Sequence, residues 1–265
     1  MQVICEIGSG WVRDQYPVED AIKAAFDCGA DFVKIQWWQN GKKLSMRRGG
    51  VVELEPWSLS ASELLSLIEK FPRKTLGASV FDPGDIGDLC HLSAFGKDAV
   101  SRLGFLKVAT QEHRYASLVE RASSFSAAHR IPIFVSIPND GCLTMGDYSS
   151  PLPITWLQCV PYYPAAVAAY DPFRIGQMRD RLPGHFGISD HTAGLGLIRK
   201  WAKGIERTTY DPLTDQADAE IMNIDVAEVH FCYHAALRGL VPDGGPWSLS
   251  PADFKKYVEV AHGSH

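Results

Sequence analysis

The stretch FGISDHTAGL, residues 186–195, decides how the rest of the chain is interpreted. Its first half is short, apolar and framed by glycine, which is typical of a buried strand. The strand then ends on Ser189, Asp190 and His191. A hydroxyl, a carboxylate and an imidazole at the end of a buried strand need polar partners. The pattern therefore indicates a functional site at a strand end, as in folds built on parallel strands.

Seven other segments have similar strand-like composition, and helical patterns separate most of them. The predicted strands are 3–8, 31–37, 75–81, 104–110, 131–137, 155–160, 185–189 and 225–231. This alternation predicts an α/β protein, a (β/α)8 TIM barrel that forms a single domain over residues 1–265. A doubly wound open sheet is the main alternative, but no GxGxxG turn follows the first strand to support it.

Helical spacing and capping residues predict helices between these strands. The predicted helices cover 17–29, 58–71, 113–129, 171–182 and 250–262, the last with Ser250 as its N-cap and Pro251 at its first position. One helix is predicted to be replaced by a loop at about 137–153, where Gly, Pro, Ser and Asp are frequent. A polar insertion at 204–222 precedes the last strand.

Composition and charge exclude several classes of protein. The chain has 46% hydrophobic and 22% charged residues and a net charge of −5, which disfavours nucleic acid and anionic membrane surfaces as partners. No apolar run is long enough to cross a membrane. The six cysteines contain no CxxC pair, which favours reduced thiols and a cytoplasmic location.

The ends of the predicted strands carry polar side chains that a barrel would bring together. In chain order they are Glu6, Lys34, Gln36, Ser79, Lys107, Thr110, Glu112, Ser136, Tyr163, Ser189, Asp190, His191, Glu228 and His230. Lysines and hydroxyls converging on one pocket suit a phosphate or carboxylate ligand. Two histidines on adjacent strands could share a divalent metal ion, with a carboxylate or water completing its shell.

At these positions the chain resembles the barrel domain of the sialic acid synthases, which condense phosphoenolpyruvate with an N-acylated amino sugar. The motifs that carry the resemblance run from residue 3 to about residue 260. They are CEIGSG, GADFVKIQWW, LKVATQE, QCVPYYPA, GISDHT and AEVHF, followed by PDGGPWSLSPADF. The resemblance does not include the small C-terminal antifreeze-like domain that family members usually carry.

The resemblance implies a role for each matched position. His191 and His230 match the family's ligands for Mn²⁺ or Mg²⁺, and Glu112, Lys107 and Glu6 are the expected catalytic residues. Glu112 falls on a carboxylate that assists at the reacting carbons. The expected substrate-binding residues are Lys34, Gln36, Ser79, Thr110, Ser136, Tyr163, Ser189, Asp190 and Glu228. Among them, Lys34, Ser79, Thr110, Ser136 and Ser189, together with Lys107, would hold phosphoenolpyruvate, and Gln36, Tyr163, Glu228 and Glu6 would line the acceptor side.

The implied activity is a metal-dependent condensation of phosphoenolpyruvate with an aldehyde, such as an amino sugar, by a cytoplasmic homodimer. Departures from the family pattern lie on the acceptor side. Pro161 replaces an asparagine, and Gly244 replaces a histidine.

Other interpretations of the same residues stay open. The histidines could be core residues satisfied by backbone groups, and the lysines could be paired with Glu6 and Glu112 instead of a ligand. A Schiff-base aldolase on the same barrel is one alternative function. A non-catalytic binding or assembly subunit that retains the fold is the other.

Overall fold

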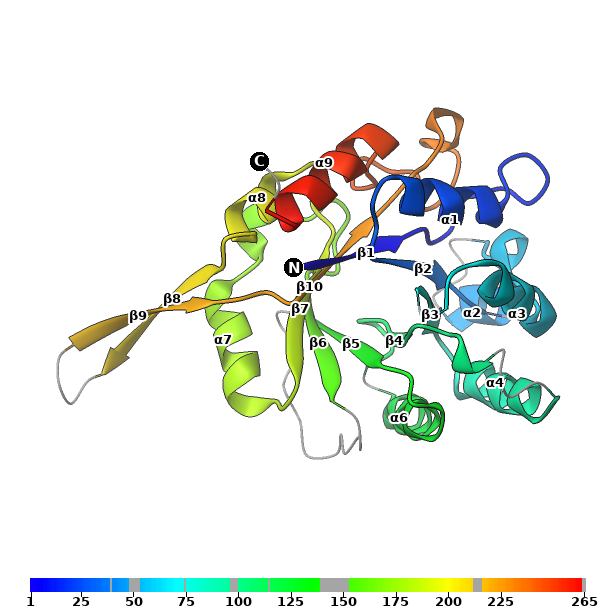
Figure 1. Ribbon diagram of the computed structural model, residues 1–265, viewed down its shortest axis with the longest axis horizontal. Helices are drawn as coiled ribbons and strands as arrows, with labels where there is room; N and C mark the ends of the chain where they lie inside the picture. The colour runs from blue at the N-terminus through cyan, green and yellow to red at the C-terminus, as the bar shows by residue number, and fades with distance from the viewer. Residues whose placement is uncertain are drawn as a thin grey trace.

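The computed structural model describes residues 1–38, 40–47, 53–73, 75–95, 100–113, 115–138, 153–211 and 216–263. Within these residues, eight strands form a closed parallel barrel in the order β1-β10-β7-β6-β5-β4-β3-β2 (Figure 1). The strands are β1 (Gln2–Glu6), β2 (Phe32–Gln36), β3 (Leu76–Val80), β4 (Leu106–Val108), β5 (Ile133–Pro138), β6 (Ile154–Cys159), β7 (His185–Asp190) and β10 (Val226–His230). The predicted barrel is confirmed, and each predicted strand is present.

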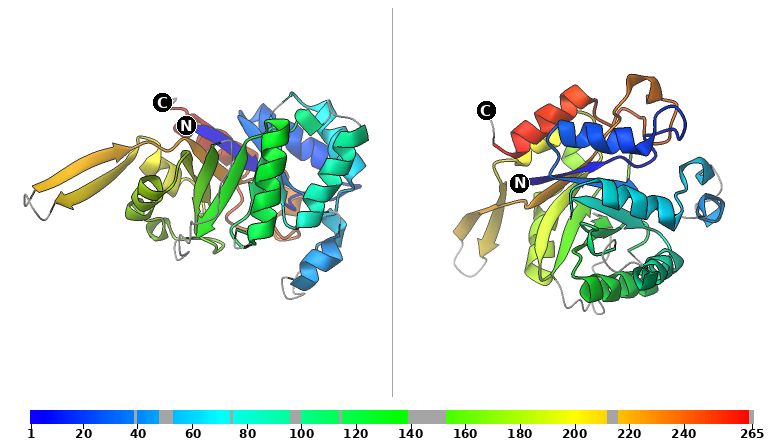
Figure 2. Two further views of the ribbon diagram at one scale, coloured as in Figure 1. Left: turned by 90° about the horizontal axis from the view of Figure 1, so that it is seen from below. Right: turned by 45° about the vertical axis from the view of Figure 1, so that its right-hand side comes forward.

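Helices cover the outside of the barrel (Figure 2). They are α1 (Val18–Asp27), α2 (Gly41–Arg47), α3 (Ala61–Lys70), α4 (Pro83–Phe95), α6 (Ala116–His129), α7 (Pro172–Arg181), α8 (Gly196–Trp201) and α9 (Pro251–Ala261), with short 3-10 turns at Glu55–Trp57, Val167–Ala169 and Ala235–Leu237. The five predicted helices are confirmed as α1, α3, α6, α7 and α9. The sequence analysis did not predict α2, α4 and α8.

Capping side chains fix where several helices begin. Ser60 accepts a hydrogen bond from the Glu63 backbone N–H at 3.2 Å, and the Glu63 carboxylate accepts one from the Ser60 N–H at 2.7 Å, which forms a capping box on α3. Ser250 accepts from the Asp253 N–H at 3.2 Å, with Pro251 in the first turn, as predicted for α9. These caps satisfy backbone donors that the helices leave free.

Two segments were predicted to be irregular, 137–153 and 204–222, and the structure describes only the second of them in full strands. The predicted loop at 137–153 lies largely outside the described residues, which stop at Pro138 in β5 and resume at Pro153. The polar insertion forms an antiparallel ribbon of β8 (Ile205–Asp211) and β9 (Gln216–Met222), with Ile205 opposite Met222. The ribbon projects away from the barrel (Figure 1).

Side chains alternate between the two faces of each strand, so the barrel has an outer core against the helices and an inner core along its axis. In β1, Val3 and Cys5 belong to the large cluster between strands and helices, whereas Ile4 belongs to a small cluster inside the barrel. That inner cluster consists of Ile4, Phe105, Phe134, Leu157 and Val226, with Phe32 packed against it. Because side chains alternate with a period of two, Glu6 follows Ile4 on the inner face. The amino-terminal part of the barrel is therefore apolar, and its carboxyl-terminal end is polar.

Candidate active site

The polar end of the barrel encloses a cavity of about 330 Å³. It is lined by Glu6, Lys34, Gln36, Ser79, Lys107, Thr110, Glu112, Tyr163, Ser189, His191, Glu228 and His230, all of them predicted site residues. Strand register explains the convergence. Glu6 lies beside both His230 and Lys34, and Glu228 lies beside Ser189. Parallel strands thus place residues from distant parts of the sequence at one level of the barrel.

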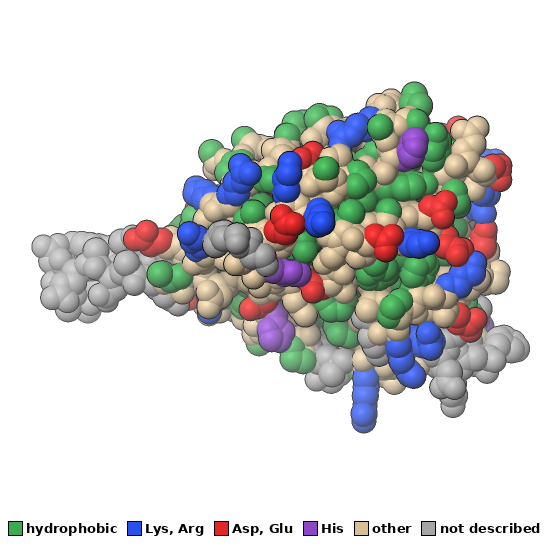
Figure 3. Space-filling model, turned by 45° about the horizontal axis from the view of Figure 1, so that its top comes forward, with side chains coloured by type: hydrophobic (Ala, Val, Ile, Leu, Met, Phe, Trp, Pro, Cys, Tyr) green, Lys and Arg blue, Asp and Glu red, His purple; other side chains and the backbone are tan. Residues whose placement is uncertain are grey.

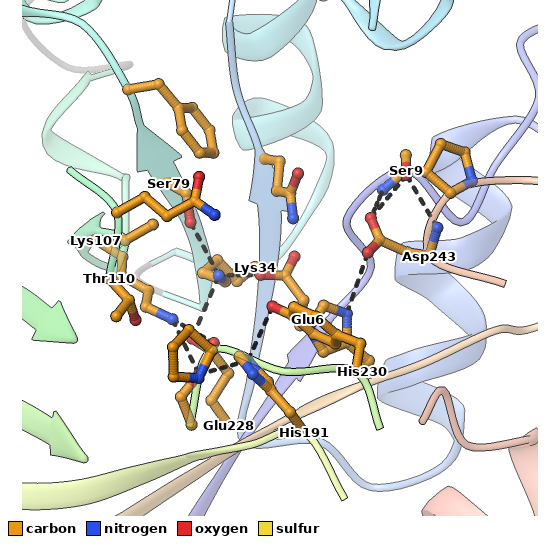
Figure 4. Close-up of a pocket in the computed structure, with 18 of the residues that line it drawn as sticks. Glu6, Ser9, Lys34, Ser79, Lys107, Thr110, His191, Glu228, His230 and Asp243 are labelled. Carbon is orange, nitrogen blue, oxygen red and sulfur yellow. Dashed lines mark hydrogen bonds and ion pairs between the residues drawn. The ribbon is translucent and has the colours of Figure 1, made fainter. Parts of the chain in front are cut away.

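Two lysines and two glutamates form a buried network on the cavity floor (Figure 4). Lys34 Nζ contacts the Glu6 carboxylate, lies 3.3 Å from Glu228 Oε2 and donates to Ser79 Oγ at 2.9 Å. Lys107 contacts Glu228 and lies 3.4 Å from Ser189 Oγ. Each of these charged residues is at most 4% exposed, so mutual pairing is what makes their burial tolerable.

The network shifts the pKa values of its members in opposite directions. Burial lowers the pKa of Lys107 more than Glu228 raises it, and the nearby charge of Lys34 lowers it further. For Lys34, attraction to Glu228 and Glu6 outweighs burial and raises its pKa. Burial raises the pKa of Glu6, and Lys34 only partly opposes this. The pKa of Glu228 is held low because Lys107 and Lys34 together outweigh its burial.

The sequence left open that the two lysines pair with Glu6 and Glu112, and the structure shows only part of this pairing. Lys34 does pair with Glu6, but the shared partner of both lysines is Glu228. An ammonium group has three hydrogens to donate. Lys34 has three partners, whereas Lys107 has Glu228 and Ser189 within the described residues. Lys107 is consequently the lysine with a donor left for a ligand in the cavity.

The two histidines stand on neighbouring strands with their rings 5.3 Å apart. His191 Nδ1 lies 2.8 Å from the carbonyl oxygen of Val160, which can only accept a hydrogen bond. The hydrogen of a neutral ring therefore sits on Nδ1, and Nε2 keeps its lone pair. Burial, with repulsion from His230 and Lys107, lowers the pKa of His191 well below its ordinary value, so the ring is neutral at pH 7.

These histidines fit a divalent metal ion. A neutral imidazole whose other nitrogen is hydrogen-bonded is the usual form of a metal ligand. His230 Nδ1 is buried without a hydrogen-bond partner among the described residues, and Asp243 Oδ1 lies 3.6 Å from it. In the part of the chain that the structure describes, no group of three or more His, Cys, Asp or Glu residues is placed to hold a metal. The protein would supply two ligands and leave the other positions to substrate or water.

Tyr163 lies over the histidines at the mouth of the cavity. Its ring stacks on His191 with centroids 4.1 Å apart, and its hydroxyl is 3.1 Å from His191 Nε2. Trp247 also packs against Tyr163, with ring centroids 5.3 Å apart. This aromatic wall, together with Pro161, bounds the side of the cavity where the sequence departs from the family pattern.

Two predicted site residues do not line the cavity. Asp190 accepts hydrogen bonds from the Thr192 N–H at 2.8 Å and from Tyr257 of α9 at 3.1 Å. Because successive residues in a strand point to opposite faces, Ser189 and His191 face the cavity and Asp190 faces the helices. Ser136 is fully buried, and its hydroxyl has no hydrogen-bond partner among the described residues.

The sequence analysis missed cavity residues that come from loops. Asp243 Oδ2 accepts hydrogen bonds from both the backbone N–H and the hydroxyl of Ser9, each at 2.7 Å. This pair ties the loop after β1 to the loop after β10, and it positions the Asp243 carboxylate beside His230 (Figure 4). The motif PDGGPW contains Asp243 and Trp247, but nothing in its spacing predicts which strand end they reach.

Comparisons with known proteins support the fold. No family model matches the sequence, and no curated protein matches it by sequence. Among solved structures, the chain is similar to N-acetylneuraminic acid (sialic acid) synthetase from Leptospira borgpetersenii serovar Hardjo-bovis, in complex with citrate, at 18% identity and a TM-score of 0.72. The match covers 99% of this chain and 82% of the synthetase. The chain has the fold of the sialic acid synthase barrel.

Two further structures share this fold at lower similarity. A spore coat polysaccharide biosynthesis protein of Bacillus subtilis is similar at 20% identity and a TM-score of 0.63. This match covers 99% of the present chain and 67% of the spore coat protein. A truncated 3-deoxy-D-arabino-heptulosonate 7-phosphate synthase of Thermotoga maritima is similar at 10% identity and a TM-score of 0.58. This match covers 99% of the present chain and 86% of the synthase. The resemblance expected from the sequence motifs is thus confirmed at the level of the barrel.

Charged side chains are spread over the face that Figure 3 presents. Basic and acidic side chains are interspersed there instead of gathering in one basic patch. Among the described residues, no helix is long and apolar enough to cross a membrane.

Proposed function

We propose that this chain condenses phosphoenolpyruvate with an aldehyde acceptor and releases inorganic phosphate. The observation that carries the proposal is the shared cavity of Lys107, Lys34 and their hydroxyl neighbours with His191 and His230. The first group suits a phosphate and a carboxylate, and the second suits a divalent metal.

The donor half of the cavity would bind phosphoenolpyruvate through charge and hydrogen bonds. Lys107 has an ammonium hydrogen beyond those given to Glu228 and Ser189. Ser79 and Thr110 supply hydroxyls on the same wall. An incoming phosphate would gain charge-assisted hydrogen bonds from side chains that are themselves buried, such as Lys107 and Ser79, which strengthens each bond.

The acceptor half would hold the aldehyde near the two histidines. A divalent ion on His191 and His230 would polarise the aldehyde oxygen. Glu112, 2% exposed and part of the cavity wall, would stabilise the positive character that develops on the donor carbon after the new carbon–carbon bond forms. Water would then add at that carbon, and the tetrahedral adduct would lose phosphate toward Lys107 as its new hydroxyl gives up a proton and becomes the 2-keto oxygen. An amino sugar or a related aldehyde is the proposed acceptor.

Calorimetric titration of phosphoenolpyruvate with Mn²⁺ present tests this function. We expect saturable binding to the wild-type chain and a loss of at least tenfold in affinity for Lys107→Met. Lys200→Met, an exposed position on α8, is the matched control and should bind like the wild type. Phosphate release on adding N-acylated amino sugars then tests turnover. Absence of phosphoenolpyruvate binding in the wild type would reject the proposal and favour a non-catalytic subunit.

One observation favours a Schiff-base aldolase as the second candidate. Burial lowers the pKa of Lys107, as catalytic Schiff-base lysines require. Incubation with pyruvate and borohydride separates the two functions. Covalent mass added at Lys107 would support the aldolase, and an unmodified protein that binds phosphoenolpyruvate would support the condensing enzyme.

A further inference from the structure

A second cavity lies at the amino-terminal mouth of the barrel, at the opposite end from the candidate active site. Its volume is about 470 Å³. Its walls come from the residues that begin the strands, such as Phe32 of β2, Phe134 of β5 and Val226 of β10. None of these residues lines the candidate active site, so any ligand here would be separate from the proposed reaction.

The floor of this cavity is aromatic. The Phe105 ring packs edge-to-face against Phe134, with centroids 4.7 Å apart, and against Phe32, with centroids 5.9 Å apart. Phe105 occupies the barrel axis beside Gly77, where a side chain would overlap its ring. These rings close the barrel from inside and present an apolar surface at the mouth. Such a surface favours a planar apolar ligand over a sugar or a free phosphate.

The two charged residues at the rim of the cavity differ in whether they already have partners. Asp225 accepts a hydrogen bond from the Phe186 N–H at 3.0 Å and lies 3.7 Å from His185 Nδ1, so its carboxylate already has partners. Arg130 also lines the cavity, and its guanidinium forms no ion pair or hydrogen bond within the described residues. An arginine beside an apolar cavity is a ready partner for a carboxylate.

The backbone of Arg130 supplies an independent reason to assign it a role. It ends α6 in the left-handed conformation, with φ 52° and ψ 48°. Glycine is the usual residue at such a position, because a Cβ is strained there. Among the described residues, Arg130 is the single non-glycine residue with positive φ. An outlier of this kind points to a side chain that is needed where it stands.

We propose that the amino-terminal mouth of the barrel is a binding site for a small aryl carboxylate. The aromatic ring of the ligand lies on Phe105 and Phe134, and its carboxylate pairs with Arg130. The site needs no residue of the proposed condensation, so the two proposals stand or fall separately.

The test uses 3-phenylpropionate and its neutral analogue 3-phenylpropan-1-ol as probes, titrated by calorimetry into the full chain. We expect the wild type to bind the carboxylate at least tenfold more tightly than the alcohol. Arg130→Gly should bind both equally, whereas Arg130→Lys should keep a preference for the carboxylate. The midpoint of thermal unfolding of Arg130→Gly should not fall, because glycine adopts the left-handed conformation without strain.

The location of the site is tested with two further variants. Lys107→Met removes a cation of the candidate active site and, at a temperature where circular dichroism shows that it is folded, should leave phenylpropionate binding unchanged. Phe134→Leu removes one aromatic ring from the barrel floor, keeps it apolar and should weaken both probes alike. Equal affinity of the wild type for both probes, a preference that persists in Arg130→Gly, or loss of binding in Lys107→Met would each overturn the proposal.

Discussion

Nδ1 of His191 donates its hydrogen bond to the carbonyl oxygen of Val160, at 2.8 Å, and this contact decides which nitrogen of the ring keeps its lone pair. The sequence analysis offered two interpretations of this histidine, a core residue satisfied by backbone or a metal ligand. The geometry combines them, because the backbone contact at Nδ1 leaves the lone pair on Nε2, where a metal ion would take the place of the Tyr163 hydroxyl, 3.1 Å away. The contacts of His191, Asp243, Glu228 and Asp85 each lead to a testable prediction.

His191→Asn should keep the fold and lose the metal. The asparagine amide nitrogen can replace Nδ1 at the Val160 carbonyl, but no atom replaces Nε2. We expect Mn²⁺ affinity, measured by electron paramagnetic resonance, to fall at least about 100-fold, because loss of a ligand itself should cost no less than the 10- to 100-fold typical of its outer-shell partners. His185→Asn, exposed at the start of β7, is the control. Unchanged Mn²⁺ binding in His191→Asn would show that this histidine is not a ligand.

Asp243→Asn should weaken metal binding without contact to the metal itself. The Asp243 carboxylate lies 3.6 Å from His230 Nδ1 and is held by Ser9. An amide cannot attract the imidazole N–H as a carboxylate does, so Mn²⁺ affinity should fall by about 10- to 100-fold. Ser9→Ala keeps the carboxylate and should have a smaller effect. If both variants bind Mn²⁺ like the wild type, the aspartate does not position His230.

Glu228→Gln should destabilise the barrel by leaving two buried lysines without their shared partner. Breaking a buried ion pair from one side costs about 3–5 kcal/mol. Urea unfolding should therefore show a clearly lower midpoint, whereas Glu120→Gln on the exposed side of α6 should not. Phosphoenolpyruvate should restore part of the lost stability, because it brings negative charge to the same lysines. A wild-type midpoint for Glu228→Gln would refute the role assigned to this pairing.

Asp85 should make the stability of the protein depend on pH. Burial raises its pKa to about 6, although the backbone N–H groups of Phe81 and Asp82 oppose the shift. The folded chain then keeps a proton that the unfolded chain loses at lower pH, so the free energy of unfolding falls as pH rises from about 4 to about 6.

Asp85→Asn carries no titrating proton and should lack this component of the pH dependence. The difference between wild type and variant should change by roughly 3 kcal/mol at most across that window. Denaturant unfolding at several pH values gives the comparison, and parallel pH profiles for the two proteins would disprove the shift.

Many features of the fold could be predicted from the sequence because they are local. Apolar runs with a period of two predicted the strands, and residues such as Ser250 and Pro251 predicted a helix start. The same periodicity would have placed Asp190 on the helix side of β7, since it lies between Ser189 and His191. Helices α2, α4 and α8 were missed. The ribbon of β8 and β9 was noticed only as a polar insertion, because polar strands lack the apolar pattern that identifies buried ones.

By itself the sequence determined which side chains stand at the strand ends, because backbone alternation and strand length are properties of short segments. Tertiary structure alone decided their partners. Closure of the barrel brings Lys107 to Glu228 and not to Glu112, and it joins Ser9 to Asp243 across 234 positions. Tertiary structure also places Arg130, which has no side-chain partner within the described residues, at the other mouth of the barrel. Pairing across a barrel depends on strand order and register, which no local pattern of residues encodes.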